Sequence, residues 1–190
     1  MAKSIDKAGP EPTDAGLITA AANGDADAFE ALVKKYERRV LSTAFRYLGE
    51  ATAAEDAAQE IFLKVWRNAK RFRGKSSFST WLYRIVVNHC LNAKAKRREI
   101  LPLNEAVAEE GPNVEERYEK KRTARVVREA VDGLPGKQRM ALVLSKFDGR
   151  SYKEIAEIMG VSLSSVESLI YRAKRNLRKK LAPLTERNAL

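Results

Sequence analysis

The sequence predicts an all-α fold in which two small helical domains are joined by an acidic linker, with a helix-turn-helix in the second domain. Apolar residues recur at helical spacing through most of the 190 residues, and no segment alternates as a half-buried strand would. Between the two helical parts, residues 99–119 carry seven acidic residues against one basic residue, with Pro102, Gly111 and Pro112 among them. Such a change in composition is typical of a linker.

Four helices are predicted in the first half of the chain, after a loose start at residues 1–12. They are expected at residues 13–24, 25–49, 52–69 and 77–98. Thr52 and Glu55 have the spacing of a capping box, in which a hydroxyl and a carboxylate each bond to the other residue's backbone N–H. We therefore expect the third helix to begin at this pair.

Four more helices are predicted after the linker, at residues 114–132, 135–148, 151–159 and 163–181. Gly133, Gly149 and Gly160 follow three of these helices, as expected where a backbone leaves a helix. Ser151 and Glu154 repeat the capping-box spacing. The resulting division is a loose start at 1–12, a first domain at 13–98, a linker at 99–113 and a second domain at 114–190.

The charge of the chain indicates a polyanionic partner. With 36 Lys and Arg against 25 Asp and Glu, the formal net charge is +11, so nucleic acid is the first partner expected. The single Cys90 excludes an internal disulfide, and with the single His89 it is too few for a zinc site, so no metal or cofactor is expected. No apolar run reaches the roughly 18 residues of a membrane span, and no secretory signal is recognised, which predicts a cytoplasmic protein.

Residues 151–181 have the pattern of a helix-turn-helix. Gly160 suits the positive φ of the turn, and Ala156 is small where the two helices approach. The expected apolar wedge between the helices is formed by Ile155, Met159, Val161, Val166 and Leu169. The alternative is an ordinary amphipathic hairpin with a solvated basic face.

In a helix-turn-helix the second helix would lie in the major groove of duplex DNA. Candidates for reading base edges are Ser164, Ser165, Glu167, Ser168 and Arg172 near its start. Candidates for holding phosphates are Lys174, Arg175, Arg178, Lys179 and Lys180 further along.

Asp56 and Glu60 lie one turn apart on the third predicted helix, where like charges repel by roughly 0.2–0.5 kcal/mol. A basic partner surface would offset this repulsion. Glu55 and Asp56 also complement a helix N-terminus, which explains the first turn but not Glu60. A carboxylate metal site is a third interpretation, disfavoured because no histidine or second acidic cluster converges on this helix.

Aromatic and basic residues are interleaved around the start of the fourth predicted helix. They are Phe72, Phe78, Trp81 and Tyr83, beside Arg71, Arg73, Lys75, Arg84 and the basic run at residues 94–98. This composition suits the stacking of unpaired bases and contacts to phosphates. Core packing is an equally good interpretation of Phe78 and Trp81.

Three segments, taken together, resemble the extracytoplasmic-function class of bacterial sigma factors: AEDAAQEIFLKVWR, FRGKSSFSTWLYRIVVNHCLN and LPGKQRMALVLSKFDGRSYKEIAEIMGVSLSSVESLIYRAKRNLRKKL. The resemblance extends from about Leu17 to Leu181 in the family's order and spacing. It implies an alternative sigma factor, which is not an enzyme but binds core RNA polymerase and directs promoter recognition, strand opening and transcription initiation. The domain at 13–98 would correspond to sigma region two, and the domain at 114–190 to region four.

The resemblance also implies roles for particular residues. Asp56, Gln59, Glu60 and Leu63 would bind the beta-prime clamp helices of the polymerase. The melted minus-ten strand would be held by Phe72, Lys75, Ser76, Arg84, Asn88, Asn92, Lys96 and Arg97. The minus-thirty-five duplex would be bound by Ser164, Ser165, Glu167, Ser168, Arg172, Arg175 and Lys179. The acidic linker would thread toward the active site and RNA exit path of the polymerase.

The partners implied are core RNA polymerase, through its clamp helices and beta flap, promoter DNA, and an anti-sigma factor. No membrane insertion is implied; the chain would be cytoplasmic, or held at the inner membrane through the anti-sigma factor. Glu167 and Leu169 depart from the family by standing where basic residues are frequent. Glu167 is expected to accept from a cytosine amino group, and Leu169 to pack in the hairpin.

No function is assigned to His89 and Cys90, because they are adjacent and do not share a helix face. The alternative function is an autonomous helix-turn-helix repressor or activator, which would bind duplex DNA without polymerase. A nucleic-acid-modifying enzyme would need convergent acids, bases or metal ligands, and the sequence offers none.

Overall fold

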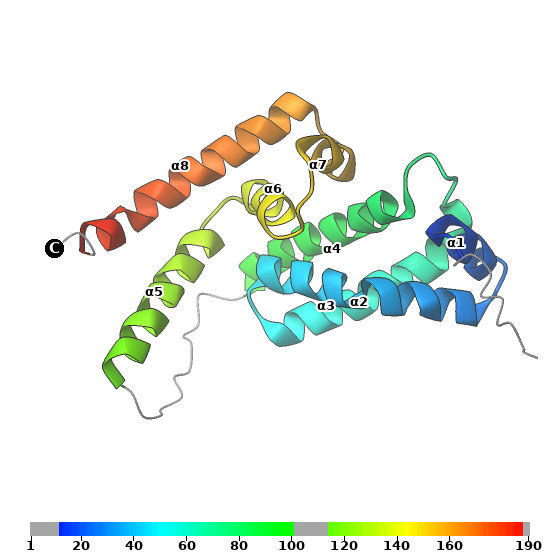
Figure 1. Cartoon of the computed structure of the whole chain (residues 1–190), viewed down its shortest axis with the longest axis horizontal. Coiled ribbons are helices and arrows are strands. Elements are labelled where there is room, and N and C mark those ends of the chain that lie inside the picture. The colour runs from blue at the N-terminus through cyan, green and yellow to red at the C-terminus, as the bar shows by residue number, and fades with distance from the viewer. Residues whose placement is uncertain (1–11, 101–113, 188–190) are drawn as a thin grey trace, which may run out of the picture.

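The computed structural model describes the backbone of residues 12–100 and 114–187, and the side chains of residues 12–95 and 122–182. Within these ranges the regular structure is helical, which confirms the predicted all-α class. The helices are α1 (Asp14–Ala22), α2 (Ala26–Leu48), α3 (Ala51–Asn68), η1 (Ala69–Arg71, a 3-10 turn), α4 (Phe78–Ile100), α5 (Val114–Asp132), α6 (Gly136–Lys146), α7 (Tyr152–Met159) and α8 (Leu163–Arg187) (Figure 1).

Side-chain caps set several of the helix starts. Thr13 accepts from the backbone N–H of Gly16, and Asp25 accepts from that of Ala28 at 2.9 Å, so α1 and α2 begin where the sequence predicts. The capping box at α7 is also confirmed. The Glu154 N–H donates to Ser151 Oγ at 3.3 Å, and the Ser151 N–H donates to Glu154 Oε2 at 2.9 Å.

The predicted capping box at Thr52 and Glu55 is wrong. The helix α3 begins at Ala51, with Glu50 as its N-cap, and the Glu50 side chain does not cap the helix. Gly49 adopts a left-handed conformation with φ of 85°, which ends α2 and lets α3 start almost at once. Thr52 therefore lies inside the first turn, where its backbone is helical and cannot take the extended form of a cap.

Two boundaries differ by a few residues. The helix α6 is shorter than predicted, because Pro135 is its N-cap and Phe147 ends it. The helix α8 runs to Arg187, beyond the expected end at residue 181. The loose start at 1–12 falls almost wholly outside the described residues, and so does the linker beyond Ile100.

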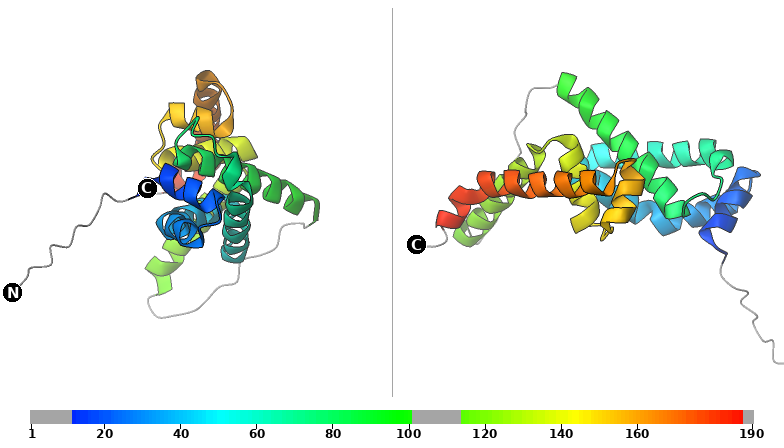
Figure 2. Two further views of the ribbon diagram at one scale, coloured as in Figure 1. Left: turned by 90° about the vertical axis from the view of Figure 1, so that its right-hand side faces the viewer. Right: turned by 90° about the horizontal axis from the view of Figure 1, so that it is seen from above.

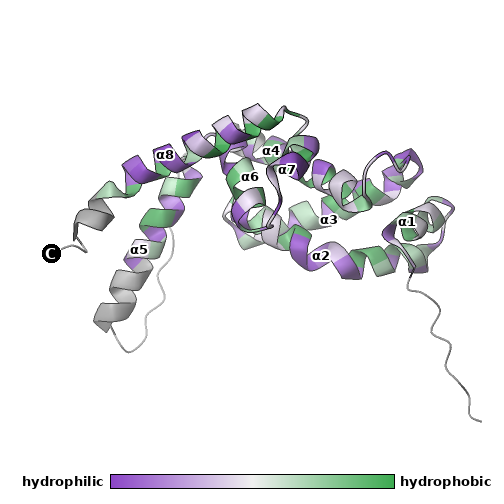
Figure 3. Cartoon of the chain, turned by 45° about the horizontal axis from the view of Figure 1, so that its top comes forward, coloured by the Kyte–Doolittle hydropathy of each residue, from purple (hydrophilic) through white to green (hydrophobic). Residues whose placement is uncertain are grey.

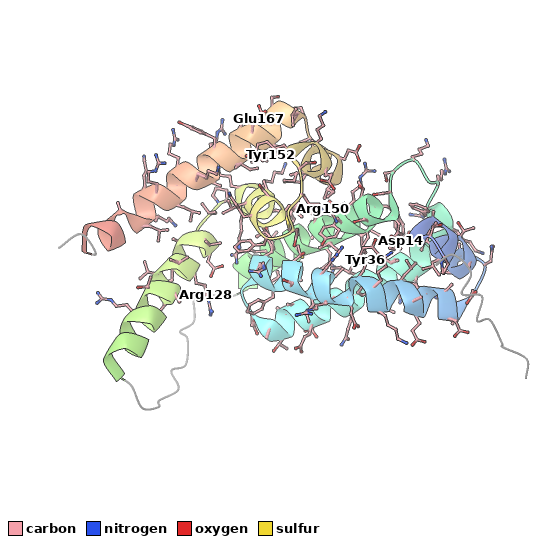
Figure 4. All side chains as sticks on the ribbon, in the orientation of Figure 1. Asp14, Tyr36, Arg128, Arg150, Tyr152 and Glu167 are labelled. Carbon is pink, nitrogen blue, oxygen red and sulfur yellow. The ribbon has the colours of Figure 1, made fainter. Side chains whose placement is uncertain are left out.

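The helices α1 to α4 form a first block. The helices α2 and α3 pack along each other, and α4 packs on both. Hydrophobic and hydrophilic residues occupy different faces of these helices (Figure 3). Tyr36 of α2 donates its hydroxyl hydrogen to Asp14 Oδ2 of α1 at 2.6 Å. Burial, and then this bond, raise the pKa of Tyr36 to about 12. The bond fixes α1 across the end of the bundle (Figure 4).

The helices α5 to α8 form a second block. The helix α6 and the turn before it pack on α8, and the small core that they share consists of Leu134, Leu142 and Ala173 with Leu177 against it. A second contact joins α5 to α8. In Figure 1, α5 and the far end of α8 extend away from the first block, whereas α6 and α7 lie against it.

The two blocks share one continuous apolar core. Met140, Leu144 and Ile155 of the second block belong to the same buried cluster as Val40 and Leu82 of the first. The contacts are made by α6 on α2 and α4, and by α7 on α4 (Figure 2). The chain is therefore closed on itself, a relationship that the sequence did not indicate.

Candidate nucleic-acid interface

The turn between α7 and α8 has helix-turn-helix geometry. Gly160 adopts φ of 65° and ψ of 39°, and its N–H donates to the Ala156 carbonyl, as a left-handed helix end requires. Of the predicted wedge, Ile155 and Val166 are buried, and Met159, Val161 and Leu169 are partly buried against the same core. The wedge is confirmed. Ile158 and Ile170 are buried as well, and their spacing from Ile155 and Val166 was the signal that could have found them.

A group of serine hydroxyls lies at the start of α8. Ser162 precedes the helix and accepts from the Ser165 N–H at 3.2 Å. Its Oγ also lies 2.8 Å from Ser165 Oγ and 3.0 Å from Ser164 Oγ. The predicted base-reading pair Ser164 and Ser165 is thus already hydrogen-bonded to a cap that sequence reasoning missed, although a serine before an apolar position is a known start signal.

The outer face of α8 is exposed and largely basic. Glu167 lies near the upper end of this helix, away from the first block (Figure 4). The predicted residues Glu167, Ser168, Arg172, Lys174, Arg175, Arg178, Lys179 and Lys180 are all exposed. Tyr171, which was not predicted, is 66% exposed between Ser168 and Arg172. An exposed aromatic ring beside arginines adds a stacking surface to this face.

One face of α3 carries the predicted acidic residues. Asp56, Gln59 and Glu60 are exposed, and Leu63 is 51% exposed on the next turn. Lys64 lies 3.8 Å from Glu60 and offsets part of the repulsion between Asp56 and Glu60. Trp66 extends the apolar part of the face and packs on Phe29 with ring centroids 4.9 Å apart.

A hollow of about 350 Å³ lies between α3 and α4. It brings Asn88 and Asn92, both predicted strand-holding residues, next to Trp81 and His89. Its remaining lining residues are Lys64, Asn68, Arg71 and Ile85. The hollow therefore combines amide hydrogen-bonding groups, an indole ring and cations, which are the groups that hold an unpaired base and its phosphate.

His89 belongs to this hollow, although no function was assigned to it from the sequence. Its Nδ1 lies 2.8 Å from Lys64 Nζ, and burial together with the nearby Lys64 charge lowers its pKa. Cys90 is fully buried in the core, and burial raises the pKa of its thiol to about 12. Among the described residues, no three His, Cys, Asp or Glu side chains are grouped to hold a metal ion.

The loop before α4 is organised by three aromatic rings. Phe72, Phe78 and Trp81 have centroid separations of 5.6–6.1 Å, in mostly edge-on contacts. Phe78 is only 3% exposed, so the core interpretation holds for it, whereas Trp81 is half-buried and also lines the hollow. Phe72, predicted to touch the strand, is half-buried in this cluster.

The remaining strand-holding candidates are distributed around the same region. Lys75 is exposed in the loop, Ser76 is half-buried, and Arg84 donates its Nε–H to the Glu157 carbonyl of α7 at 3.0 Å. Lys96 and Arg97 lie on the last turns of α4, but their side chains are outside the described residues.

Comparison with known proteins shows the family to which this chain belongs. Residues 32–100 match sigma-70 region 2, and residues 124–177 match sigma-70 region 4. The chain is 36% identical over 183 residues to the RNA polymerase sigma-H factor of Pseudomonas aeruginosa, covering 90% of this chain and 95% of that protein. It is 35% identical over 187 residues to the ECF RNA polymerase sigma-E factor of Escherichia coli, covering 92% and 97%. This chain belongs to the extracytoplasmic-function sigma factors.

Solved structures agree with the assignment. CnrH in complex with the cytosolic domain of CnrY is 27% identical to this sigma factor, with a TM-score of 0.65 over 90% of this chain and 97% of that one. RpoE in complex with the anti-sigma factor NepR from Bartonella quintana has a TM-score of 0.63 at 22% identity, over 81% and 96%, and shows the shared fold. The sequence-based prediction of an alternative sigma factor is confirmed, in preference to an autonomous repressor or activator.

Two further points concern enzymatic activity and membrane-spanning helices. Sigma factors are in general non-enzymatic. Across residues 12–100 and 114–187, no helix is both long and apolar enough to cross a membrane.

Proposed function

We propose that this sigma factor binds core RNA polymerase through α3, holds the melted minus-ten strand at α4 and reads the minus-thirty-five duplex with α8. The observation that supports this division best is that the three sets of candidate residues lie on separate parts of the structure: on α3, on α4 with the loop before it, and on α8. Each part has a different chemistry. The division assigns residues 13–98 to a region-two-like domain, 99–113 to a linker and 114–190 to a region-four-like domain.

Core polymerase would be bound by Asp56, Gln59, Glu60 and Leu63. Exposed carboxylates beside an exposed leucine suit a basic helical partner with an apolar stripe, such as the clamp helices. The beta flap would be a second contact, made by the region-four-like domain.

The melted strand would be held by the hollow between α3 and α4 and by the loop before α4. The residues concerned are Phe72, Lys75, Ser76, Arg84, Asn88, Asn92, Lys96 and Arg97. Amide groups at 88 and 92 suit the edges of an unpaired base, and Lys75 and Arg84 suit the phosphates beside it.

The duplex would be read by the exposed face of α8. The residues concerned are Ser164, Ser165, Glu167, Ser168, Arg172, Arg175 and Lys179. Their order along the helix, with short polar side chains first and long basic ones later, suits a helix that enters the major groove by its N-terminal end. Initiation would follow from binding of both promoter elements by the polymerase complex.

An anti-sigma factor is a further proposed partner, supported by the NepR complex of the Bartonella quintana protein. The proposed location is the cytoplasm, or the inner membrane surface when the anti-sigma factor holds the chain there. No insertion of this chain into the membrane is proposed.

The deciding experiment is run-off transcription with purified core polymerase from a cognate promoter, beside gel-shift binding by the free chain. Transcription that requires the chain, with tight promoter binding only in the presence of core, is the expected result. Equally tight and sequence-specific binding without core, and no transcription with it, would favour the autonomous regulator instead.

A further inference from the structure

His89 lies in the hollow between α3 and α4, although it is not among the proposed strand contacts. Its ring lines the hollow beside Asn88 and Asn92 of the same helix, and Lys64 of α3 lines it as well. At about 350 Å³ the hollow is at the small end of the range for ligand pockets, which have volumes of about 300–1,000 Å³. A space of this size suits one unpaired base, whose edges proteins read by hydrogen bonds.

The contact with Lys64 determines which nitrogen of the His89 ring carries a hydrogen. Lys64 Nζ lies 2.8 Å from His89 Nδ1. Because an ammonium group can only donate hydrogen bonds, Nδ1 must accept, and the ring must be neutral with its hydrogen on Nε2. Burial and then the Lys64 charge lower the pKa of His89, against the opposing charge of Glu60, which favours the same neutral form.

The Lys64 ammonium lies between two groups that hold it in place. Glu60 Oε2, one turn earlier on α3, is 3.8 Å from Nζ on one side, and His89 Nδ1 is on the other. Within the described part of the chain, His89 Nε2 has no hydrogen-bond partner. Its N–H is therefore the group that the ring can offer to a molecule in the hollow.

An imidazole whose hydrogen is fixed reads a base differently from an amide. Asn88 and Asn92 each carry a donor and an acceptor, and rotation of the amide exchanges them, so both can adapt to several bases. His89 Nε2–H can only donate. A base that placed an amino group against it would bring two donors together, and a hydrogen-bonding group left unpaired in the site weakens binding. His89 can therefore discriminate among bases where the two asparagines cannot.

We propose that His89 is a specificity-determining residue for the melted minus-ten strand. Its Nε2–H donates to a carbonyl oxygen or ring nitrogen of one unpaired base, and Lys64 is the positioning residue that keeps this hydrogen on Nε2. The inference rests on the proposed function of α4. Trp81 also lines the hollow and offers a ring on which the base can stack, because Phe72 packs against the indole with a centroid separation of 5.6 Å and holds it in place.

Removal of single bases tests the contact. The probe is promoter DNA with an unpaired minus-ten strand, carrying an abasic site at one position at a time, and its affinity for the complex of core polymerase with the full chain is measured. His89→Leu should weaken binding of the intact probe by roughly 2- to 10-fold, as the loss of one hydrogen bond between neutral groups does. At one position the abasic site should abolish the difference between His89→Leu and wild type, because the contact is then missing in both. A difference that persists at every position, or no difference on intact DNA, would overturn the proposal.

The base preference at that position tests the direction of the hydrogen bond. Wild type should favour bases that present an acceptor. His89→Gln, whose amide can turn to donate or accept, should bind the intact probe nearly as tightly but discriminate less among the four bases. Lys64→Met should relax the preference in the same way, since the ring can then place its hydrogen on either nitrogen. Lys64→Arg is the matched control, because a guanidinium can only donate and should keep the preference. An unaltered preference in both His89→Gln and Lys64→Met would contradict the assigned roles.

Failure of the proposed function would give a different result in the same experiment. If no abasic site weakens binding by the wild-type complex, the minus-ten strand is not read and the function proposed for α4 is wrong. If abasic sites weaken binding by wild type and by His89→Leu equally, and the intact probe binds both with the same affinity, only the role of His89 is wrong. The two failures are therefore distinct.

Discussion

Gly136 lies against the ring of Tyr47, so close that a Cβ atom at position 136 would stand 2.8 Å from the tyrosine hydroxyl oxygen. Tyr47 is 1% exposed, and Lys94 and Arg139 each lie 5.5 Å from its ring centroid. The ring is therefore held from several sides and has little room to withdraw. Glycine at the start of α6 thus sets how closely the second block approaches α2.

Gly136→Ala should lower the free energy of unfolding by about 1–3 kcal/mol, the usual range for an added carbon in a packed contact, less the gain in helix propensity. Urea denaturation measures the change. Adding Tyr47→Phe removes the clashing oxygen, so the double variant should lose less free energy of unfolding than the two single variants together. If the two losses simply add, the contact between positions 136 and 47 does not limit how closely α6 approaches α2.

The stability of the helix-turn-helix should depend on pH through Glu154. Hydrogen bonds from the Ser151 backbone and side chain, together with that from Arg150, lower the pKa of Glu154 below its usual value. Because the folded pKa is the lower one, the stabilisation is present above the unfolded pKa of about 4.3 and is lost as the pH falls through the folded pKa. Glu154→Gln should therefore be less stable than wild type at pH 7, and the difference should vanish well below pH 4. A difference that persists in acid would mean that the carboxylate charge is not its source.

Reversing Asp56 and Glu60 to Lys should abolish binding to core polymerase without unfolding the chain, since both side chains are exposed. Titration of labelled protein with core measures the affinity, and circular dichroism checks the fold. The matched control is Glu37→Lys with Glu129→Lys, which makes the same change in charge at exposed positions off α3. Equal affinity for the two double variants would remove α3 as the docking face.

Asn88→Ala should slow strand opening while leaving duplex binding by α8 intact, because Asn88 lines the hollow on α4 far along the chain from α8. Permanganate footprinting of the polymerase complex reports opening, and a fragment carrying only the minus-thirty-five element reports duplex binding. Shortening the loop at residues 72–76 should act in the same direction. Normal opening with reduced transcription would place the defect at another step.

Base reading and phosphate holding should separate along α8. Lys179→Ala should weaken binding to all promoter sequences about equally and reduce the salt slope by about one unit, the result of one lost phosphate contact. Glu167→Ala or Arg172→Ala should instead change which bases are preferred, by roughly 1–3 kcal/mol for each lost contact. Affinities for single-base promoter variants at several salt concentrations test both. If Lys179→Ala shifts the preferences and Glu167→Ala leaves them unaltered, the proposed placement of α8 in the groove is incorrect.

Local signals in the sequence were sufficient to place most helices. Ser151 with Glu154, and Gly160 with its positive φ, act through neighbours within a few positions, so their geometry follows from spacing. Thr52 shows the limit of the same reasoning. Its pattern was correct for a cap, but the early turn at Gly49 had already started the helix.

Contacts between distant positions were beyond prediction. Thr43 and Asp148 are separated by 105 positions, and no periodicity or motif relates them. Nothing in the sequence marks Arg139 as a buried residue, yet it is 2% exposed, because Asp132 and the Arg46 carbonyl compensate its buried charge. The approach of His89 to Lys64 likewise depends on how α3 and α4 pack.

One apolar core runs through both blocks, so their separation should be accompanied by a change in heat capacity. Opening would expose Met140, Leu144 and their buried neighbours to water, and the exposure of apolar surface increases the heat capacity. The free energy of closure must therefore curve with temperature, with an optimum and a weakening on both sides of it. The fraction of chains whose two blocks are separated should thus be smallest at an intermediate temperature and should rise in both chilled and heated protein.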